Sequence, residues 1–173
     1  YIKVSINTDG TIDIFDKEND REFQGLLRFE DVADLGSEYT FIPARDDSPI
    51  YSGDTSARIE LICDEEFMAQ YKIVTELRIP RSADPTAEAE RNMYVGLKER
   101  TGKRSREIVT IAITSYVSLT KNGHSVQVRT ELINTARDHR LRVLFPNNID
   151  CTRHKAESMF EAVTRENKHK PSW

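Results

Sequence analysis

Residues that commonly bind metals or take part in catalysis rarely occur close together in this sequence. Cys151 and His154 have the C-x-x-H spacing found in zinc sites. A structural zinc site needs four ligands and a catalytic one needs three plus water, and the sequence offers no second pair to complete either. We therefore interpret Cys151 as a half-buried cysteine beside a surface histidine and predict no metal site in this chain. In the charged corner 136–140, His139 is interpreted as part of a turn, where Asp138 can pair with a neighbouring arginine.

The stretch of residues 28–43 combines aromatic side chains, carboxylates, a glycine and a proline, and follows neither the strand period nor the helix period. Such a stretch is either an ordered functional loop or a connection that covers a sheet edge. Aromatic rings beside carboxylates suit sugars, because sugar C–H faces stack on rings while hydroxyls donate to acids. The spacing of the acids selects no catalytic pair, and the chain lacks nucleophile-elbow and phosphate-loop motifs. No catalytic residue is predicted.

The composition limits the classes of partner. The chain has 173 residues, a net charge of −4, 38% hydrophobic and 31% charged residues, which is typical of one globular domain. Nucleic acids and anionic membranes need a dominant basic face, so neither is expected as a partner. No apolar run approaches the roughly 20 residues of a membrane span. Two cysteines, Cys63 and Cys151, are too few for a disulfide framework, which favours a reducing compartment and a cytoplasmic location.

Alternation of apolar and polar residues predicts several antiparallel strands. Two hairpins are the clearest, because Asp9-Gly10 and Asn122-Gly123 supply residues that tolerate the positive φ angles of tight turns. The remaining alternating segments include a pair that meets across residues 64–66. The predicted strands are residues 1–7, 11–16, 57–63, 67–79, 107–120, 125–133 and 141–145.

Seven or so such strands without helical crossovers predict an all-β antiparallel β-sandwich, with one domain over residues 1–173. The long strands favour a large, wide sheet. Residues 81–106 are interpreted as a surface insertion with a short helix around 86–91, and residues 147–173 as a loosely packed tail with a short helix or strand at 156–160. We expect both chain ends to lie inside a longer polypeptide, because the sequence opens within a strand pattern.

Four blocks in order resemble the C-terminal region of bacterial α-mannosidases of glycoside hydrolase family 38, the group that includes mannosylglycerate hydrolase-like enzymes. Any one block would be weak, but together they cover nearly the whole chain. The blocks are residues 4–11 (VSINTDGT), 29–39 (FEDVADLGSEY), 134–146 (NTARDHRLRVLFP) and 156–161 (AESMFE).

The resemblance implies a parent enzyme several times longer than this chain. In the family an N-terminal α/β barrel holds the catalytic zinc and an aspartate nucleophile, a helical bundle follows, and the β-sandwich domains, including a galactose mutarotase-like supersandwich, come last. The implied chemistry is retaining hydrolysis of α-mannosides through a covalent glycosyl-enzyme intermediate. This chain matches only the start of the last part, so it is expected to be inactive alone, with zinc and catalytic residues elsewhere in the parent.

The resemblance also implies one substrate contact. In related enzymes a tyrosine at the position of Tyr39 helps to line the mannose pocket. Glu38 and Asp34 are weaker candidates, and both can instead hold the loop by accepting backbone N–H bonds. Ser37 stands where the family motif has an acidic residue, which weakens the expectation that substrate selectivity is fully retained. The expected partners are therefore the barrel, the helical bundle and a mannoside.

Two other functions remain open. An autonomous carbohydrate-binding module would need an exposed aromatic platform, and most Tyr and Phe residues fall on alternating positions that predict burial. A purely structural interdomain scaffold would expose apolar strand edges that normally meet the helical bundle. The isolated chain would then tend to self-associate.

Overall fold

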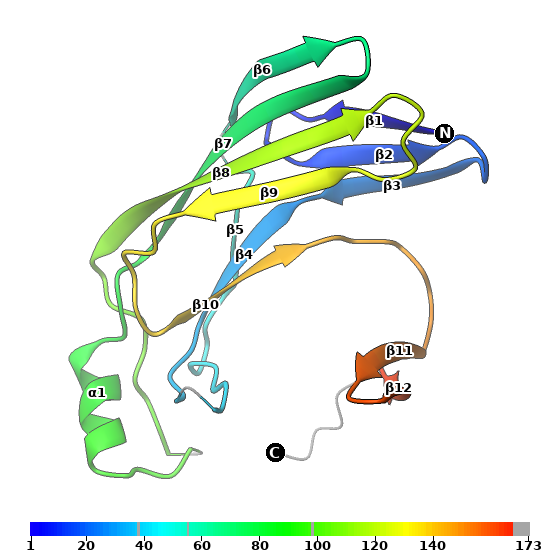
Figure 1. The fold of residues 1–173 in the computed structure, drawn as a ribbon. Coiled ribbons are helices and arrows are strands. Elements are labelled where there is room, and N and C mark those ends of the chain that lie inside the picture. The colour runs from blue at the N-terminus through cyan, green and yellow to red at the C-terminus, as the bar shows by residue number, and fades with distance from the viewer. Residues whose placement is uncertain (38, 55, 98, 168–173) are drawn as a thin grey trace.

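The computed structural model describes residues 1–173 except residues 38, 55, 98 and 168–173. Within the described residues it contains twelve strands and one helix (Figure 1). The elements are β1 (Ile2–Ile6), β2 (Ile12–Asp16), β3 (Arg21–Leu26), β4 (Arg28–Ala33), β5 (Ile50–Tyr51), β6 (Arg58–Glu65), β7 (Met68–Pro80), α1 (Pro85–Asn92), β8 (Ile108–Thr120), β9 (Gln127–Leu132), β10 (His139–Leu144), β11 (Arg153–Ser158) and β12 (Glu161–Glu166).

All strand pairs are antiparallel, which confirms the predicted all-β class. The strands form four sheets, ordered β1-β2-β3, β10-β4-β5, β6-β7-β8-β9 and β11-β12. The hairpins predicted at the Asp-Gly and Asn-Gly turns are present as β1-β2 and β8-β9, and β6 pairs with β7 as expected. In the described residues no helix is long and apolar enough to cross a membrane.

The hydrophobic core lies between the β1-β2-β3 sheet and the four-stranded sheet, which form two layers in Figure 1. Alternation along β7 and β8 turns Ile73, Leu77, Ile111 and Ile113 inward, where each is at most 1% exposed, and Ile12 meets them from β2. Burial of each such side chain contributes about 1.5–3 kcal/mol. The long hairpin β7-β8 is therefore the base on which the other elements are placed.

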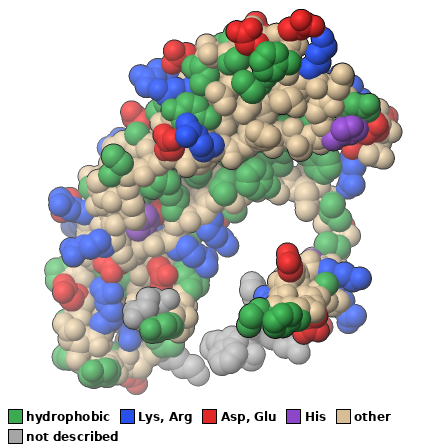
Figure 2. All heavy atoms as spheres, viewed as in Figure 1, with side chains coloured by type: hydrophobic (Ala, Val, Ile, Leu, Met, Phe, Trp, Pro, Cys, Tyr) green, Lys and Arg blue, Asp and Glu red, His purple; other side chains and the backbone are tan. Residues whose placement is uncertain are grey.

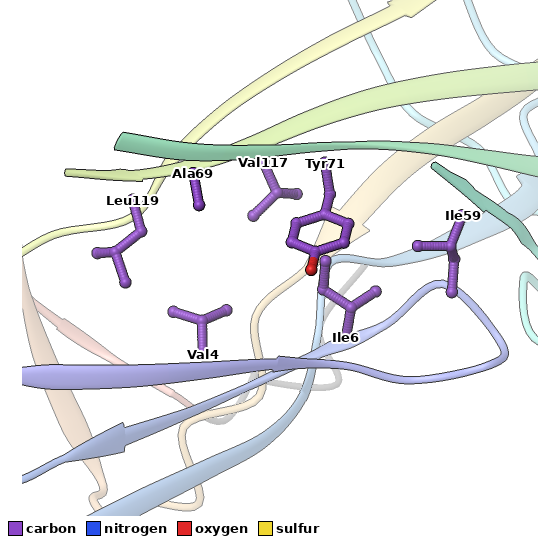
Figure 3. A pocket seen from close by; sticks show the side chains of 7 residues that line it. All are labelled: Val4, Ile6, Ile59, Ala69, Tyr71, Val117 and Leu119. Carbon is purple, nitrogen blue, oxygen red and sulfur yellow. The ribbon is translucent and has the colours of Figure 1, made fainter. Parts of the chain in front are cut away.

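An apolar cavity of about 270 Å³ lies between the two layers beside β1 (Figure 3). Val4 and Ile6 of β1 face Val117 and Tyr71 of the opposite sheet across it. A sugar needs several converging hydrogen-bonding groups, whereas the side chains that line this cavity supply only the Tyr71 hydroxyl. The cavity is a loosely filled part of the core and not the candidate sugar site.

The edge strands of the four-stranded sheet are incompletely covered. Val128 and Leu132 of β9 pair with Val117 and Ile113 of β8, so their side chains point to the same inner face. Val117 and Ile113 are buried, but Val128 is 36% and Leu132 is 40% exposed. Figure 2 shows hydrophobic side chains gathered on the side of the sheets that faces the β11-β12 hairpin. The inner face of the four-stranded sheet is therefore only partly covered at β9.

One sequence interpretation needs correction, and one alternative is resolved. Residues 28–33 were expected to be irregular but form β4, which is buried on both faces and therefore shows no alternation. The helix-or-strand alternative at 156–160 resolves as the end of β11 and its turn into β12. This hairpin stands apart from the sheets in Figure 1, and Phe160 at its tip is fully exposed.

Candidate functional site

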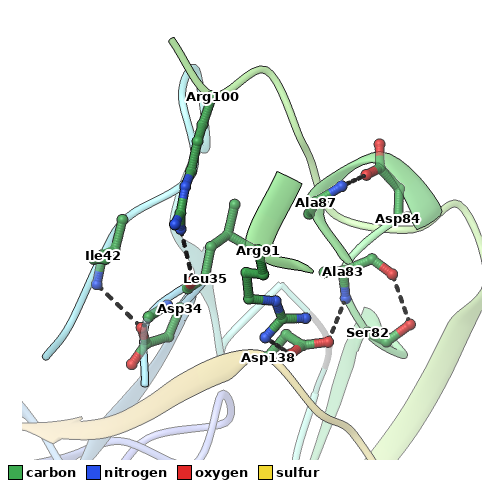
Figure 4. Close-up of polar contacts among 11 residues, drawn as sticks. Asp34, Leu35, Ile42, Ser82, Ala83, Asp84, Ala87, Arg91, Arg100 and Asp138 are labelled. Carbon is green, nitrogen blue, oxygen red and sulfur yellow. Dashed lines mark hydrogen bonds and ion pairs between the residues drawn. The ribbon is translucent and has the colours of Figure 1, made fainter. Parts of the chain in front are cut away.

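The loop between β4 and β5 is closed at its neck by Asp34. The Asp34 carboxylate accepts hydrogen bonds from the backbone N–H groups of Gly36 (3.0 Å) and Ile42 (3.1 Å). Figure 4 shows the bond from Ile42 to Asp34. Leu35 N–H also donates to the Ile42 carbonyl at 2.8 Å, so the two arms of the loop are bonded directly. Asp34 therefore has the loop-holding role that was one of its two sequence interpretations.

The tip of this loop presents Tyr39 to solvent. Ser37 and Thr40 exchange backbone hydrogen bonds of 3.2 and 3.3 Å, and the Ser37 hydroxyl accepts from Tyr39 N–H at 3.3 Å. A Cβ atom on Gly36 would lie 1.7 Å from the Thr40 carbonyl oxygen, so only glycine fits under the turn. The Tyr39 side chain is 89% exposed, while Glu38 lies outside the described residues.

Phe41 fastens one flank of the loop to β10. The Arg140 guanidinium carbon lies 3.5 Å from the centre of the Phe41 ring, which is a cation–π contact. Such contacts contribute about 0.5–2 kcal/mol depending on desolvation. Of the two aromatic residues near the tip, Phe41 is thus engaged within the chain, and Tyr39 is available for a ligand or a partner.

The described residues of the segment 81–106 form one unit around α1. Asp84 caps the helix by accepting from Ala87 N–H at 2.9 Å, and Pro85 occupies the first turn. Glu90 accepts from Thr101 N–H (2.7 Å), from the Thr101 hydroxyl (2.8 Å) and from Gly102 N–H (3.0 Å). These bonds, led by the one from Thr101 N–H, hold the pKa of the Glu90 carboxyl below its usual value.

This unit packs against the loop between β4 and β5, which we call the Tyr39 loop. Arg100 donates to the Leu35 carbonyl oxygen at 3.4 Å and to the Val95 carbonyl oxygen at 3.1 Å. Ala87 of α1 shares a small buried cluster with Ala33, Leu35 and Ala44 at the loop base. A pocket of about 260 Å³ lies between the two segments. The loop and residues 81–106 therefore form one end of the molecule.

Exposed apolar side chains gather on these two adjoining segments, which we call the end surface. Its members are Tyr39 (89% exposed), Phe41 (39%), Met93 (67%), Tyr94 (91%) and Leu97 (59%). The expectation that Tyr and Phe residues are mostly buried is wrong here, because these residues lie in loops and not on alternating strand positions. Apolar side chains grouped in this way commonly mark an interaction site.

Asp138 ties the start of β10 to both segments. Its carboxylate accepts from Ala83 N–H at 2.9 Å and pairs with the Arg91 guanidinium at 3.0 Å, while its carbonyl accepts from Asp34 N–H at 2.9 Å (Figure 4). The sequence interpretation placed the partner of Asp138 at a neighbouring arginine, but Arg91 lies 47 residues away. His139 is not in a turn either, because it begins β10.

The C-x-x-H residues do not form a metal site in the described residues. His154 Nδ1 lies 2.6 Å from the Asn167 side-chain oxygen, and Asn167 donates to the Cys151 sulfur at 3.1 Å. Cys151 is exposed and not half-buried as expected, and both it and Cys63 are free thiols. Among the described residues no group of three or more His, Cys, Asp or Glu could hold a metal ion.

The sequence of residues 1–173 matches along its full length a family model described as "Glycosyl hydrolases family 38 C-terminal domain". The chain belongs to this family. The resemblance carried by the four sequence blocks is thereby confirmed. A curated relative from Halalkalibacterium halodurans, named "Putative mannosylglycerate hydrolase", is 32% identical over 172 residues, which are 99% of this chain and 19% of the relative.

Two solved structures of the same family share the fold. An alpha-mannosidase from Enterococcus faecalis V583 has a TM-score of 0.94 and 34% identity, covering 100% of this chain and 20% of that one. A glycosyl hydrolase family 38 protein from Enterococcus faecalis has a TM-score of 0.92 and 34% identity over 96% of this chain and 20% of that one. The chain thus spans about one fifth of the length of its family 38 relatives.

Sequence reasoning missed one group of this end of the molecule. Asp31, Asp47, Arg104 and His139 come together beneath the loop, although they are spread over more than 100 residues. A signal was present at Asp31, a carboxylate inside a stretch that forms a strand, because a charge in a buried strand needs partners. The identity of those partners has no local signature.

Proposed function

We propose that this chain is the non-catalytic C-terminal β-domain of an α-mannosidase, and that Tyr39 contacts the mannoside in the active site of the parent. The observation that carries the proposal is the exposed Tyr39 ring on a loop whose neck is closed by Asp34. An aromatic side chain on an ordered loop loses little conformational entropy on binding. Its ring can stack on a sugar C–H face and its hydroxyl can bond a sugar oxygen.

The proposal assigns the bond-breaking chemistry to the rest of the parent polypeptide. The parent is taken to be a zinc-dependent retaining glycosidase whose metal and nucleophile lie outside residues 1–173. The donor set of the described residues does not fit a metal ion, so no reaction step is assigned to them. The end surface would meet the catalytic barrel, and the uncovered inner face of β9 would meet other parts of the same polypeptide.

The test is a set of kinetic measurements on the full-length parent. Tyr39→Ala should lower kcat/KM for an α-mannoside by about tenfold to a hundredfold, since one good contact is worth about 1.4–2.7 kcal/mol. Tyr39→Phe separates the ring from the hydroxyl. Phe67→Ala, which removes an exposed ring from the β6-β7 turn outside the end surface, is the control and should stay within about twofold. Equal kcat/KM for wild type and Tyr39→Ala would contradict the proposal.

The exposed aromatics Tyr39 and Tyr94 also support a second candidate, an autonomous carbohydrate-binding module. This alternative requires the isolated chain to bind a sugar without the barrel. Isothermal titration with mannose distinguishes the two functions. Binding at millimolar or lower concentration that disappears in Tyr39→Ala would favour the module, whereas the main proposal predicts no heat of binding for the isolated chain.

A further inference from the structure

Four charged side chains are buried together where β4, β10, the Tyr39 loop and residues 81–106 meet. Asp31 is completely buried and lies 2.8 Å from the Arg104 guanidinium and 2.5 Å from His139 Nδ1. The Arg104 Nε atom lies 3.0 Å from the Asp47 carboxylate. The exposed fractions of the Arg104, His139 and Asp47 side chains are only 10%, 7% and 14%. We call these four residues the buried ion cluster.

Both ring nitrogens of His139 have a hydrogen-bond partner within the chain. Nδ1 faces the Asp31 carboxylate, and Nε2 lies 3.1 Å from the Asn134 side-chain oxygen. That atom of Asn134 is an acceptor, because it also receives the Ala136 N–H at 3.0 Å. Nε2 therefore donates to Asn134, and Nδ1 shares a proton with the Asp31 carboxyl group. Arg104 and His139 thus each contact a carboxylate of the cluster, and such pairing is the condition under which ionisable groups are tolerated in a protein interior.

The buried ion cluster reaches both ends of the Tyr39 loop. The second Asp47 oxygen accepts from Ala33 N–H at 2.8 Å, so the returning arm of the loop is bonded to the residue where β4 ends. Arg104 connects this junction to the insertion, where it also pairs with Ala83 through a β-bridge. His139 connects it to β10. The buried ion cluster thus connects the Tyr39 loop, residues 81–106 and β10.

Other charged groups around the cluster have partners of their own. Glu30, next to Asp31 on β4, pairs with Arg142 across the β4-β10 ladder. Asp138, next to His139, pairs with Arg91 of α1. Arg140 contacts the Phe41 ring. The four members of the cluster are therefore matched mainly to one another, and the loss of one leaves an unbalanced charge at the loop base.

We propose that the buried ion cluster positions Tyr39, with Arg104 and His139 as positioning residues that act through the loop and never touch the substrate. This rests on the proposed role of Tyr39 and adds to it the part of the molecule that sets the place of the ring. In this proposal, residues 81–106 hold the Tyr39 loop in place. Removal of a cluster charge frees the neck of the loop and leaves the β7-β8 core in place.

Hydrogen exchange on the full-length parent tests the positioning directly. The amides of Gly36, Thr40 and Ile42 are hydrogen-bonded within the loop and report its order. In Arg104→Met their exchange should be at least about tenfold faster, while β7 and β8 exchange as in wild type. Arg81→Met, which removes an exposed ion pair from the same segment, is the control and should leave the loop unchanged.

Two further variants keep the test decisive. Asp47→Asn preserves shape and removes one charge, so it should show the same loop-specific exchange even where Arg104→Met does not fold. A double-mutant cycle on kcat/KM then separates positioning from general stability. Arg104→Met should cost less than about twofold in the Tyr39→Ala background, because an effect that passes through Tyr39 is lost with it.

Loop amides that exchange at the wild-type rate in Asp47→Asn and Arg104→Met would overturn the positioning proposal, as would additive losses in the cycle. A kcat/KM that is insensitive to Tyr39→Ala would instead overturn the proposed function. In that case the exchange measurement still decides whether the cluster orders the loop.

Discussion

Gly36 and Thr40 approach so closely that a Cβ atom on residue 36 would lie 1.7 Å from the Thr40 carbonyl oxygen. This contact sets the shape of the turn that carries Tyr39. The constraint is steric, and it adds to the hydrogen bonds that join the two arms of the loop at Asp34, Leu35 and Ile42.

Gly36→Ala should therefore distort the tip of the loop. The added methyl group has no space and should cost about 1–3 kcal/mol, as overpacking in a tight site does. Urea unfolding measures the free-energy change, and kcat/KM of the parent should fall with it. Gly96→Ala is the control, because only a flexible Glu99 oxygen lies within 4 Å of the added atom, at 3.8 Å. Equal stability of the two variants would contradict the steric account.

Asp138 should tolerate some replacements and not others. Its φ is +55°, a conformation that Asn also adopts, so Asp138→Asn isolates the loss of charge. Asp138→Ala also strains the backbone and leaves Ala83 N–H without its acceptor, which should cost about 1–3 kcal/mol. The melting temperature of Asp138→Ala should be well below that of Asp138→Asn. The opposite order would show that the Asp138 bonds do not hold the insertion.

Acid should weaken the insertion through Glu90. The folded-state pKa of this carboxyl is lowered from its usual 4.5, so its contribution to stability is present above pH 4.5 and is lost as the pH falls through the lowered value. The free energy of unfolding of the wild type should fall below pH 4.5. That of Glu90→Gln should fall less over the same range, because this variant lacks the contribution of the Glu90 carboxylate at every pH. Glu88→Gln, exposed on the same helix, should follow wild type in urea midpoints measured at several pH values.

The isolated chain should self-associate through the inner face of β9. Val128 and Leu132 are more than one-third exposed on the face that is buried in β8, and Ile133 is 82% exposed. Leu132→Lys places a charge on this face and should shift the sedimentation coefficient toward that of a monomer. A wild-type chain that sediments as a monomer at high concentration would contradict this prediction.

Much of the fold could be predicted from local pattern. The Asp-Gly and Asn-Gly turns located both hairpins, and the short helix predicted around 86–91 is present as α1. β4 was not predicted, because burial on both faces removes the alternation on which the prediction relies. The strand order could not be predicted, since β10 pairs with β4 across more than 100 residues.

The candidate site was predictable only in part. The residues of the Tyr39 loop stood out by composition, and the loop-holding role of Asp34 followed from its chemistry. The partners that fix the loop could not be found, because Arg91 reaches Asp138 and Arg104 reaches Asp31 from distant segments. Contacts of this kind depend on tertiary packing and have no sequence spacing of their own.

The most direct measurement is a crystal structure of the full-length parent with a bound α-mannoside inhibitor. The account predicts that a Tyr39 side-chain atom lies within about 4.5 Å of the bound sugar, which is contact distance. A sugar ring that is bound in the catalytic barrel with Tyr39 turned to solvent, beyond reach of any sugar atom, would contradict it.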